Sequence, residues 1–470
     1  MLTIDEIVKS TGGQLLNGTP DHPVSGVSID SRTIKNGDIF VAIKGDVFDG
    51  HNYIEDAIRK GACGAIIKEG HKISDYILEK VSKDKVILSV NDTMTALQEM
   101  ARYYRNKFHL PVVGITGSNG KTTTKEMIWY IMSHKFLVLK NEGNLNNHIG
   151  VPLTFFRLIS SHNMALIEMG ISDRGELTRL CEIAAPTAAV ITNIGPTHLE
   201  KLGRIENVAE AKSEILDFIK SDGVCILNRD DTFFDIFKAK ASGRIISFGM
   251  SSAADVYTES AEIAQDGKSI DSMTFRLICP LGEVDINMHV IGLHNLYNAL
   301  CAAATACALG THIEDIKYGL EKFTPVKMRS TIEKISGIYV INDTYNANPA
   351  SMVAAIDTLK TIKEGKRKYA VIGDMLELGK NTTTAHRDLG IYIAGAGIDG
   401  LLAIGEFAEN VADGAISAGM DENKVMAYKD FARTLEKIRL WLNAGDILLV
   451  KGSRGMKMER IVEGLRETLG

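Results

Sequence analysis

The residues best suited to chemistry lie in one run, 116–124, which reads Thr-Gly-Ser-Asn-Gly-Lys-Thr-Thr-Thr. The two glycines of this run allow a tight turn whose backbone N–H groups can point at phosphate oxygens. Lys121 is then placed to reach the outer phosphates, and the Thr122 hydroxyl to bind a magnesium ion. The run is shorter than the usual G-x-x-x-x-G-K-[ST] motif, because the expected first glycine falls on Ile115. An ordinary glycine-rich turn is the alternative interpretation.

The elements on either side of this run favour phosphate binding over an ordinary turn. Residues 111–115 form an apolar run that is typical of a buried parallel strand, and residues 125–132 have the pattern of a helix. A strand, a glycine-rich turn and a helix, in this order, are the context in which such loops bind phosphate. The N-terminus of the helix adds partial positive charge at the turn.

Two further candidates follow predicted strands. Glu168 comes directly after the apolar run 164–167, and His198 lies in the loop after the strand 187–192. Open α/β sheets bind ligands beyond the carboxyl ends of their strands. A carboxylate and an imidazole in that place can both serve magnesium sites, although nitrogen is a less usual magnesium ligand. The alternatives are a surface charge at a strand end and an ordinary loop histidine.

Three polar residues lie on predicted helices. Lys212 falls on the helix 208–219, and its ordinary interpretation is a solvated helix face. Asn295 and Asn298 are three residues apart near the start of the helix 294–309, so they share one face of it. There they can hydrogen-bond a base, a ribose or phosphates, and the alternative is capping of the helix N-terminus.

The composition restricts the classes of protein that fit. The chain has 470 residues, 45% of them hydrophobic and 24% charged, and a net charge of −6. This length favours about three domains, and the charge gives no reason to expect a nucleic-acid partner. We expect no membrane span, because no stretch approaches about 18 apolar residues, and no signal peptide. The six cysteines lack metal spacing and are expected to be reduced core residues, which fits a cytoplasmic protein.

The pattern of elements predicts an α/β chain. We expect a small first domain at 1–88, a central domain at 89–323 with a mostly parallel sheet, and a last α/β domain at 324–470, with a hinge near Pro325. Residues 244–290 are the exception, because they have the pattern of antiparallel strands joined by turns.

The motifs resemble, in their order along the chain, those of the Mur ligases. These are ATP-dependent enzymes that form amide bonds in peptidoglycan precursors, and the resemblance covers essentially the whole chain. It rests on residues 117–122, Glu168, 193–198, 211–214, His294, Asn295, Asn298, Arg329 and 343–349. One departure is Lys327-Met328 before Arg329, where relatives more often have glycine before the arginine.

Three features resemble the branch of the family that adds D-alanyl-D-alanine to UDP-N-acetylmuramoyl-tripeptide. They are residues 144–154, residues 345–349, and residues 373–379 with 450–455. The Asp-Asn-Pro-Arg motif of the branch that adds diaminopimelate or lysine is absent, as is the N-terminal G-x-G-x-x-G of the alanine-adding branch. Folylpolyglutamate synthases share the ATP core but lack a first domain resembling residues 25–67. A related ligase that adds a diamino acid and a nucleotide-dependent binding module remain the alternatives.

The resemblance also implies the architecture and the roles of residues. It implies a UDP-sugar domain, a central P-loop ATPase domain and a C-terminal Rossmann-like domain. We expect a monomer, although the sequence does not give the oligomeric state. Two magnesium ions are implied, one held by Thr122 and Glu168 and a second by His198. Lys212 is implied to be carbamylated, that is, converted to a carboxylate by CO2. The implied nucleotide-binding residues are Gly117, Ser118, Asn119, Gly120, Lys121, Thr122, Thr123, Asn295, Asn298, Arg329 and Asp343. The implied substrate-binding residues are Ser31, Arg32, Asp49, Gly50, His51, Asn146 and Asn147.

Overall fold

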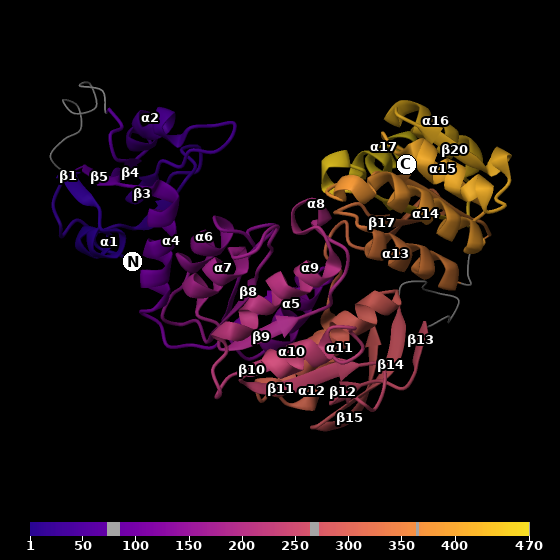
Figure 1. The fold of residues 1–470 in the computed structure, drawn as a ribbon, viewed down its shortest axis with the longest axis horizontal. Coiled ribbons are helices and arrows are strands. Elements are labelled where there is room, and N and C mark those ends of the chain that lie inside the picture. Colours follow the sequence, from indigo (N-terminus) through magenta and orange to yellow (C-terminus); the bar gives the residue numbers. More distant parts are fainter. Residues whose placement is uncertain (73–84, 264–271, 363–365, 470) are drawn as a thin grey trace. The chain divides into compact units, whose positions relative to one another are not determined.

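The structure, a computed structural model, describes residues 1–72, 85–263, 272–362 and 366–469 (Figure 1). The chain divides into two units, and each is described by itself. The first unit comprises Met1–Gly114, Phe136–Ile171 and Gly175–Ala188. The second comprises Ile115–Lys135, Ser172–Arg174 and Ala189–Gly470.

The first unit begins with a five-stranded sheet in the order β1-β5-β4-β3-β2, in which only the pairing of β1 with β5 is antiparallel. The strands are β1 (Gln14–Asn17), β2 (Gly26–Ser28), β3 (Asp38–Val41), β4 (Gly64–Lys68) and β5 (Val86–Val90). The helices are α1 (Ile4–Thr11), α2 (Ile54–Arg59) and α4 (Thr93–Arg105). Phe40, Ile54 and Ile67 are fully buried between sheet and helix, so the expected α/β character of this region is confirmed.

The rest of the first unit supplies part of the large sheet. Strands β6 (Val112–Thr116), β8 (Met164–Glu168) and β7 (Val138–Lys140) lie in that order, and β7 and β8 are parallel. All five residues of β8 are buried, which explains the continuous apolar run that ends at Glu168. Helices α6 (Gly150–Phe155) and α7 (Glu176–Ala184) belong to this part.

The second unit begins at the end of β6 and continues into α5 (Lys121–Met132), as the sequence predicts. Its part of the large sheet has the order β13-β14-β12-β11-β10-β9, with β15 paired to β14. The strands are β9 (Ala188–Ile191), β10 (Val224–Asn228), β11 (Arg244–Gly249), β12 (Val256–Tyr257), β13 (Ala261–Ile263), β14 (Met273–Cys279) and β15 (Gly282–Met288). The helical elements are α8 (Leu199–Leu202), α9 (Ile205–Ser213), the 3-10 helix η2 (Glu214–Phe218), α10 (Phe234–Lys240), α11 (Leu293–Ala308) and α12 (Ile313–Lys322).

The expectation of antiparallel strands at 244–290 is only partly right. β14 and β15 do form an antiparallel hairpin, because a tight turn joins them. β11, however, is parallel to β10, and β12 is parallel to β11. Helix α10 connects β10 to β11, and such a crossover returns the chain to the sheet in the same direction.

The last segment is a doubly wound sheet in the order β16-β17-β21-β18-β19-β20, in which only β16 and β17 pair antiparallel. The strands are β16 (Thr331–Ile335), β17 (Ile338–Asp343), β18 (Lys368–Gly373), β19 (Gly400–Ile404), β20 (Val425–Tyr428) and β21 (Ile447–Lys451). One core contains α13 (Pro349–Thr361), α14 (Thr382–Gly395) and α15 (Ala408–Ser417), and a second contains α16 (Phe431–Trp441) and α17 (Glu459–Leu469). Neighbouring residues of a strand alternate between the two cores, as Ala370 and Val371 do, so helices cover both faces of the sheet (Figure 1).

Two expectations from composition can be compared with this structure. All six cysteines carry free thiols; five of them are buried, as expected for core residues, and Cys307 is half-buried. In the part of the chain that the structure describes, none of the helices is both long and apolar enough to cross a bilayer.

Candidate nucleotide and substrate sites

The phosphate loop has a backbone that only glycine accepts at two positions. Gly117 and Gly120 have φ values of 140° and 81°. A Cβ at Gly117 would meet Thr192 Oγ1 at 2.0 Å, and a Cβ at Gly120 would meet Asn298 Oδ1 at 2.2 Å. Both clashes are far inside van der Waals contact, so the glycines are needed for the space as well as for the turn.

The loop that follows β9 holds the phosphate loop in shape. Asn193 O accepts from Ser118 N at 2.8 Å, and Asn193 Oδ1 accepts from Asn119 N at 3.0 Å. The Thr192 hydroxyl donates to Asn119 O at 2.6 Å, and Ser118 Oγ donates to Gly195 O at 3.0 Å. Thr192 was not predicted as a site residue, and Asn193 was quoted only as part of a motif. The signal available for both was their place at the carboxyl end of a parallel strand.

Lys121 and Thr122 lie at the start of α5, where the loop meets the helix. Lys121 Nζ donates to Gly117 O at 2.7 Å and to Ser118 O at 3.2 Å, so the ammonium lies over the loop. Thr122 is 7% exposed, and its hydroxyl accepts from Arg329 Nη2 at 2.9 Å. The loop therefore combines a cation, a hydroxyl, a helix N-terminus and a second cation from the last segment, which together suit a bound polyphosphate.

The two asparagines of α11 are buried against the phosphate loop. Asn298 Oδ1 accepts from Thr124 Oγ1 at 3.2 Å, and Asn298 Nδ2 donates to Asn295 Oδ1 at 3.3 Å. Asn295 Nδ2 in turn donates to Ile291 O at 2.8 Å. The pair thus joins α11 to the first turn of α5, a structural role that goes beyond the capping considered from the sequence.

Lys212 does not lie on a solvated helix face, so that ordinary interpretation is wrong. Its side chain is only 1% exposed, because the helix face that carries it packs inward. Within the described residues it forms neither a hydrogen bond nor an ion pair. Burial, together with the charge of Lys121, lowers the pKa of Lys212 well below its usual value. A neutral amine is therefore favoured at this position.

His198 pairs with a carboxylate from the last segment. Its Nδ1 lies 2.6 Å from Glu377 Oε2, and the hydrogen bond from His198 lowers the pKa of Glu377 against the effect of burial. Both residues have a left-handed backbone, with φ values of 54° and 63°. Glu377 was not predicted as a site residue, although it lies in the 373–379 motif. A carboxylate on one ring nitrogen fixes the tautomer and leaves Nε2 as the nitrogen available to a ligand.

Arg329 and Asp343 occupy neighbouring positions in the last segment. Arg329 lies over the ring of Tyr345, with its Cζ 3.9 Å from the ring centroid. Asp343 pairs with Lys451 at 2.5 Å and accepts from Ser330 N at 3.0 Å. Burial would raise the pKa of Asp343, but the charge and hydrogen bond of Lys451 outweigh it and keep that pKa below its usual value.

Glu168 is held at the end of β8 by two asparagines. The carboxylate is 2% exposed, and its Oε1 accepts from Asn146 Nδ2 at 2.8 Å. Asn141 brackets the same residue, accepting from Glu168 N at 3.0 Å and donating to Glu168 O at 2.8 Å. Asn141 was missed from the sequence, because nothing before the fold links it to a residue 27 positions away. Asn147, predicted to bind substrate, accepts from the backbone N of Gly150, the first residue of α6, at 2.9 Å.

The predicted substrate residues of the first segment fall into two groups. Asp49 Oδ1 lies 2.6 Å from His51 Nδ1, and His51 Nε2 accepts from Lys68 N at 3.0 Å. Gly50 lies so close to the backbone just after β3 that a Cβ there would meet Ile43 N at 2.7 Å. In the other group, Ser31 is 5% exposed, whereas the side chain of Arg32 is 84% exposed and pairs with Asp30 at 2.7 Å.

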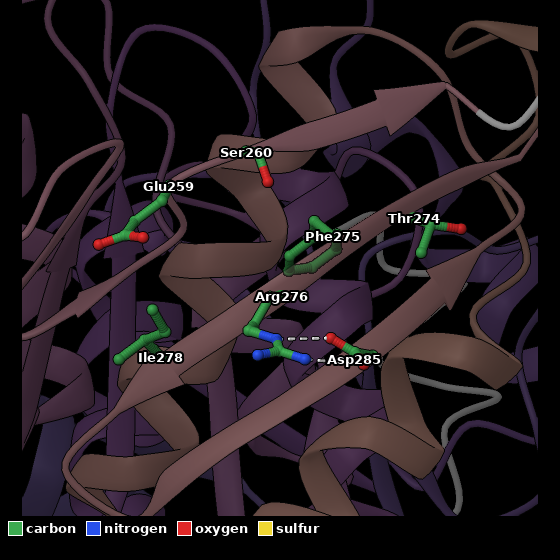
Figure 2. Close-up of a pocket in the computed structure, with 7 residues that line it drawn as sticks. All are labelled: Glu259, Ser260, Thr274, Phe275, Arg276, Ile278 and Asp285. Atoms are coloured by element: carbon green, nitrogen blue, oxygen red, sulfur yellow. Dashed lines mark hydrogen bonds and ion pairs between the residues drawn. The ribbon is translucent and has the colours of Figure 1, made fainter.

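One hollow elsewhere in the second unit holds none of these residues. It has a volume of about 440 Å³ and lies on the β14–β15 hairpin. Figure 2 shows that Arg276 and Asp285 face each other across the two strands, with Arg276 Nε 2.9 Å from Asp285 Oδ1. Arg276 and Asp285 therefore neutralise each other within the hollow.

Comparisons with known proteins place these features in context. Three family models match: the Mur ligase family, catalytic domain, at residues 23–105; the Mur ligase middle domain at 115–306; and the Mur ligase, glutamate ligase domain, at 328–454. The UDP-N-acetylmuramoyl-tripeptide–D-alanyl-D-alanine ligase of Bacillus subtilis is 34% identical over 473 residues, which cover 99% of this chain and 98% of that protein.

Two solved structures are similar along nearly the whole chain. A crystal structure of MurF from Acinetobacter baumannii has a TM-score of 0.89 and 33% identity, and the match covers 99% of both chains. The MurF ligase from Thermotoga maritima in complex with ADP has a TM-score of 0.81 and 27% identity, and the match covers 94% of this chain and 97% of that one.

Proposed function

The chain belongs to the Mur ligase family, and we propose that it joins D-alanyl-D-alanine to UDP-N-acetylmuramoyl-tripeptide at the expense of ATP. The observation that carries the proposal is the full-length similarity to ligases named for this reaction, at 34% identity in the Bacillus subtilis protein. The three α/β segments and their mostly parallel sheets match the MurF structures. The phosphate loop supplies the nucleotide chemistry that this reaction needs.

We place ATP on the phosphate loop. The turn at Gly117 and Gly120, the N-terminus of α5 and Lys121 together suit the phosphates, and a solved relative carries ADP. Asn295 and Asn298 are buried beside the loop, and Arg329 reaches its Thr122 hydroxyl. We therefore assign these residues to nucleotide binding, together with Asp343 of the same segment.

The reaction requires activation of a carboxylate, because an amine does not displace a carboxylate oxygen directly. Transfer of the γ-phosphoryl group of ATP to the tripeptide carboxylate gives ADP and an acyl phosphate, in which phosphate is a good leaving group. The D-alanyl-D-alanine amine then attacks the acyl carbon, and phosphate leaves. Lys121 and Arg329 are the cations that face the loop, and they stabilise the charge that develops on the transferring group.

We assign magnesium binding to Thr122 and Glu168, with His198 at a second site. The oxygen donors fit the metal, since magnesium prefers hydroxyl, carboxylate, phosphate and water oxygens. Within the described residues there is no cluster of three His, Cys, Asp or Glu side chains, so phosphate and water would complete the coordination. When bound, the metal would neutralise charge on the phosphates. Glu377 holds the His198 ring at Nδ1, which leaves Nε2 for the metal.

Lys212 is proposed to carry a carbamate. Its burial and its lowered pKa favour the neutral amine, which is the form that adds CO2. A protonated lysine beside Lys121 would add positive charge where the metal has to bind, whereas the carbamate supplies two oxygens and a negative charge. The absence of an acidic partner for Lys212 among the described residues fits this assignment.

The remaining assignments come from the family. Ser31, Arg32, Asp49, Gly50 and His51 are proposed for the uridine nucleotide of the substrate. Asn146, which donates to Glu168, and Asn147 are proposed to lie along the peptide part. We propose domain boundaries at 1–88, 89–323 and 324–470, and a monomeric enzyme of the bacterial cytoplasm.

A coupled assay tests the proposal. Phosphate release from ATP is measured with UDP-N-acetylmuramoyl-tripeptide, with and without D-alanyl-D-alanine, and the product is identified by mass spectrometry. We expect release that depends on the dipeptide and a product heavier by the dipeptide minus water. Turnover with diaminopimelate or lysine on the UDP-dipeptide, and none with D-alanyl-D-alanine, would instead identify the diamino-acid-adding branch. Nucleotide binding without any product would favour a binding module.

A further inference from the structure

The turn that carries Arg329 has an unusual backbone. Met328 and Ser330, on either side of the arginine, have φ values of 62° and 51°. Neither is glycine, and L-residues persist in this region only where their surroundings hold them there. Such residues are common at functional sites, where neighbouring contacts hold the strained backbone in place.

Three hydrogen bonds donated by backbone N–H groups hold the turn. Arg329 N donates to Val326 O at 3.1 Å within the turn itself. Tyr345 N donates to Met328 O at 3.1 Å, and Ser330 N donates to Asp343 Oδ1 at 3.0 Å. Two of the three therefore come from the end of β17 and the residues just after it.

Lys451 fixes the orientation of the carboxylate in this arrangement. It is 3% exposed, and its Nζ donates to Asp343 Oδ2 at 2.5 Å and to Asn346 O at 3.0 Å. Asp343 and Lys451 are register partners on the parallel strands β17 and β21, so the backbone itself places them side by side. Both carboxylate oxygens of Asp343 are thus occupied by protein donors.

Arg329 is the outward end of the arrangement. Its guanidinium lies over the ring of Tyr345 and donates from Nη2 to the Thr122 hydroxyl of the phosphate loop. An aromatic face stabilises a cation and restricts the plane of the guanidinium. The chain of contacts therefore runs from Lys451 through Asp343 and Ser330 N to Arg329.

We propose that Lys451, Asp343 and Tyr345 are positioning residues that aim Arg329 at the phosphate loop, and that Lys451 and Asp343 act on the reaction through this arginine. The inference rests on the proposed function, in which Arg329 stabilises charge on the transferring phosphoryl group. It differs from the family-based assignment of Asp343, because the carboxylate is engaged by Lys451 and the Ser330 amide.

Two variants of the full-length enzyme test the proposal. Lys451→Met removes the cation but keeps an unbranched side chain, and Tyr345→Leu removes the ring under Arg329. Because misplacing a catalytic group by about 1 Å costs about 10²-fold in rate, we expect kcat to fall by about that factor in Lys451→Met, with a smaller fall in Tyr345→Leu. The KM for UDP-N-acetylmuramoyl-tripeptide is expected to stay unchanged, since neither residue is assigned to that substrate.

The same segment offers matched controls. Arg466 pairs with Glu333 through hydrogen bonds of 2.8 Å, so Arg466→Met removes a cation from an ion pair away from the loop. Tyr339 lies under Lys334 at 5.0 Å, so Tyr339→Leu removes a ring from another cation–aromatic pair. Both controls are expected to keep kcat within about twofold, since neither residue is assigned to the nucleotide or to the substrates.

A double variant and one structural measurement decide whether Lys451 acts through the arginine. The double variant Arg329→Met/Lys451→Met is expected to have the same kcat as Arg329→Met alone. If Lys451 acts only through Arg329, its substitution has no further effect once the arginine is gone. Hydrogen exchange of the Ser330 amide is expected to accelerate in Lys451→Met. The inference would be overturned if the kcat losses of the two single variants multiplied in the double variant. It would also be overturned by a folded Lys451→Met enzyme with normal kcat and normal exchange of the Ser330 amide. A wild-type enzyme without ligase activity would instead overturn the proposed function.

Discussion

Lys212 and Lys451 are two buried lysines with opposite surroundings. Lys212, on α9, is 1% exposed and has no acidic partner within the described residues. Lys451, at the end of β21, is 3% exposed and lies 2.5 Å from Asp343. A buried ammonium is stable only when a counter-charge and hydrogen bonds replace its water. The difference indicates that Lys451 serves as the cation paired with Asp343, whereas Lys212 is kept as a neutral amine.

The contrast separates two uses of the same residue type. A paired lysine orients its partner, as Lys451 orients Asp343, and its loss leaves a carboxylate that is only 15% exposed without compensation. An unpaired buried lysine costs stability while it stays unmodified, so its retention points to chemistry that needs the free amine. Each of the following experiments tests one side of this contrast.

The largest effect is expected for Lys212→Ala. If the carbamate of Lys212 takes part in metal binding, its loss should lower kcat by about 10³-fold, as for the loss of a major electrostatic group. Added formate or acetate should restore part of the activity, because a small carboxylate can occupy the vacated space. The rate of ATP-dependent ligation, measured against formate concentration, is the readout.

Lys451→Met is the control for this rescue. That variant also loses a buried lysine, but no carboxylate is missing from its site, so formate should leave its rate unchanged. Near-normal activity of Lys212→Ala, or equal responses of both variants to formate, would remove the distinction between the two lysines.

The next effect concerns stability. Asp343→Asn keeps an oxygen that can accept from Ser330 N but leaves Lys451 buried without a counter-charge. Removing one partner of a buried ion pair costs about 3–5 kcal/mol, so we expect a loss of that order in the free energy of unfolding. Urea denaturation measures it.

Glu333→Gln is the matched variant, since Glu333 pairs with Arg466 at 2.7 Å and the side chains are 27% and 52% exposed. Glu333→Gln is expected to lower the free energy of unfolding by no more than about 1 kcal/mol. A similarly small loss for Asp343→Asn would mean that the Lys451–Asp343 pair is effectively solvated.

The contrast also marks how far the sequence could predict this protein. The strand, turn and helix around Lys121 could be predicted because their pattern is local and contiguous. The role of Lys212 in the site was predicted only through the resemblance. The local periodicity predicts a solvated helix face, whereas in the folded chain α9 packs with Lys212 inward.

The contacts that hold the site in place were beyond sequence reasoning for a different reason. Lys451 meets Asp343 across 108 residues of chain, and Glu377 meets His198 across 179. These pairs form only because parallel strands end at one edge or because two loops meet after folding. Likewise, the direction of β11 depends on a crossover helix rather than on the alternation within the strand.

A pH experiment distinguishes the two lysines without an assay of activity. The folded pKa of unmodified Lys212 lies below its unfolded value, so between the two the unfolded chain binds one more proton. The free energy of unfolding should therefore rise with pH in this window, by at most about 1.4 kcal/mol per pH unit, until the unfolded lysine also loses its proton.

Asp343 determines the acid part of the dependence of stability on pH. Its folded pKa is lowered, so its contribution is present above the unfolded value and is lost as pH falls through the folded one. Stability measured in CO2-free buffer, relative to Lys212→Met at alkaline pH and to Asp343→Asn at acid pH, should show the two limbs separately. An alkaline profile of the wild type parallel to that of Lys212→Met would show that Lys212 is charged when folded.

The smallest effect is expected at Met328, and it tests what the Lys451–Asp343 pair has to hold. Met328 has a φ of 62°, which costs an L-residue about 1–2 kcal/mol, whereas glycine adopts it freely. Glycine also gains conformational freedom in the unfolded chain, so we expect Met328→Gly to raise the free energy of unfolding by only about 0.5–1 kcal/mol. Lys327→Gly, at a neighbouring position without positive φ, should instead lower it by a similar amount. If both variants lose stability equally, the turn is not strained, and Asp343 is not needed to hold it.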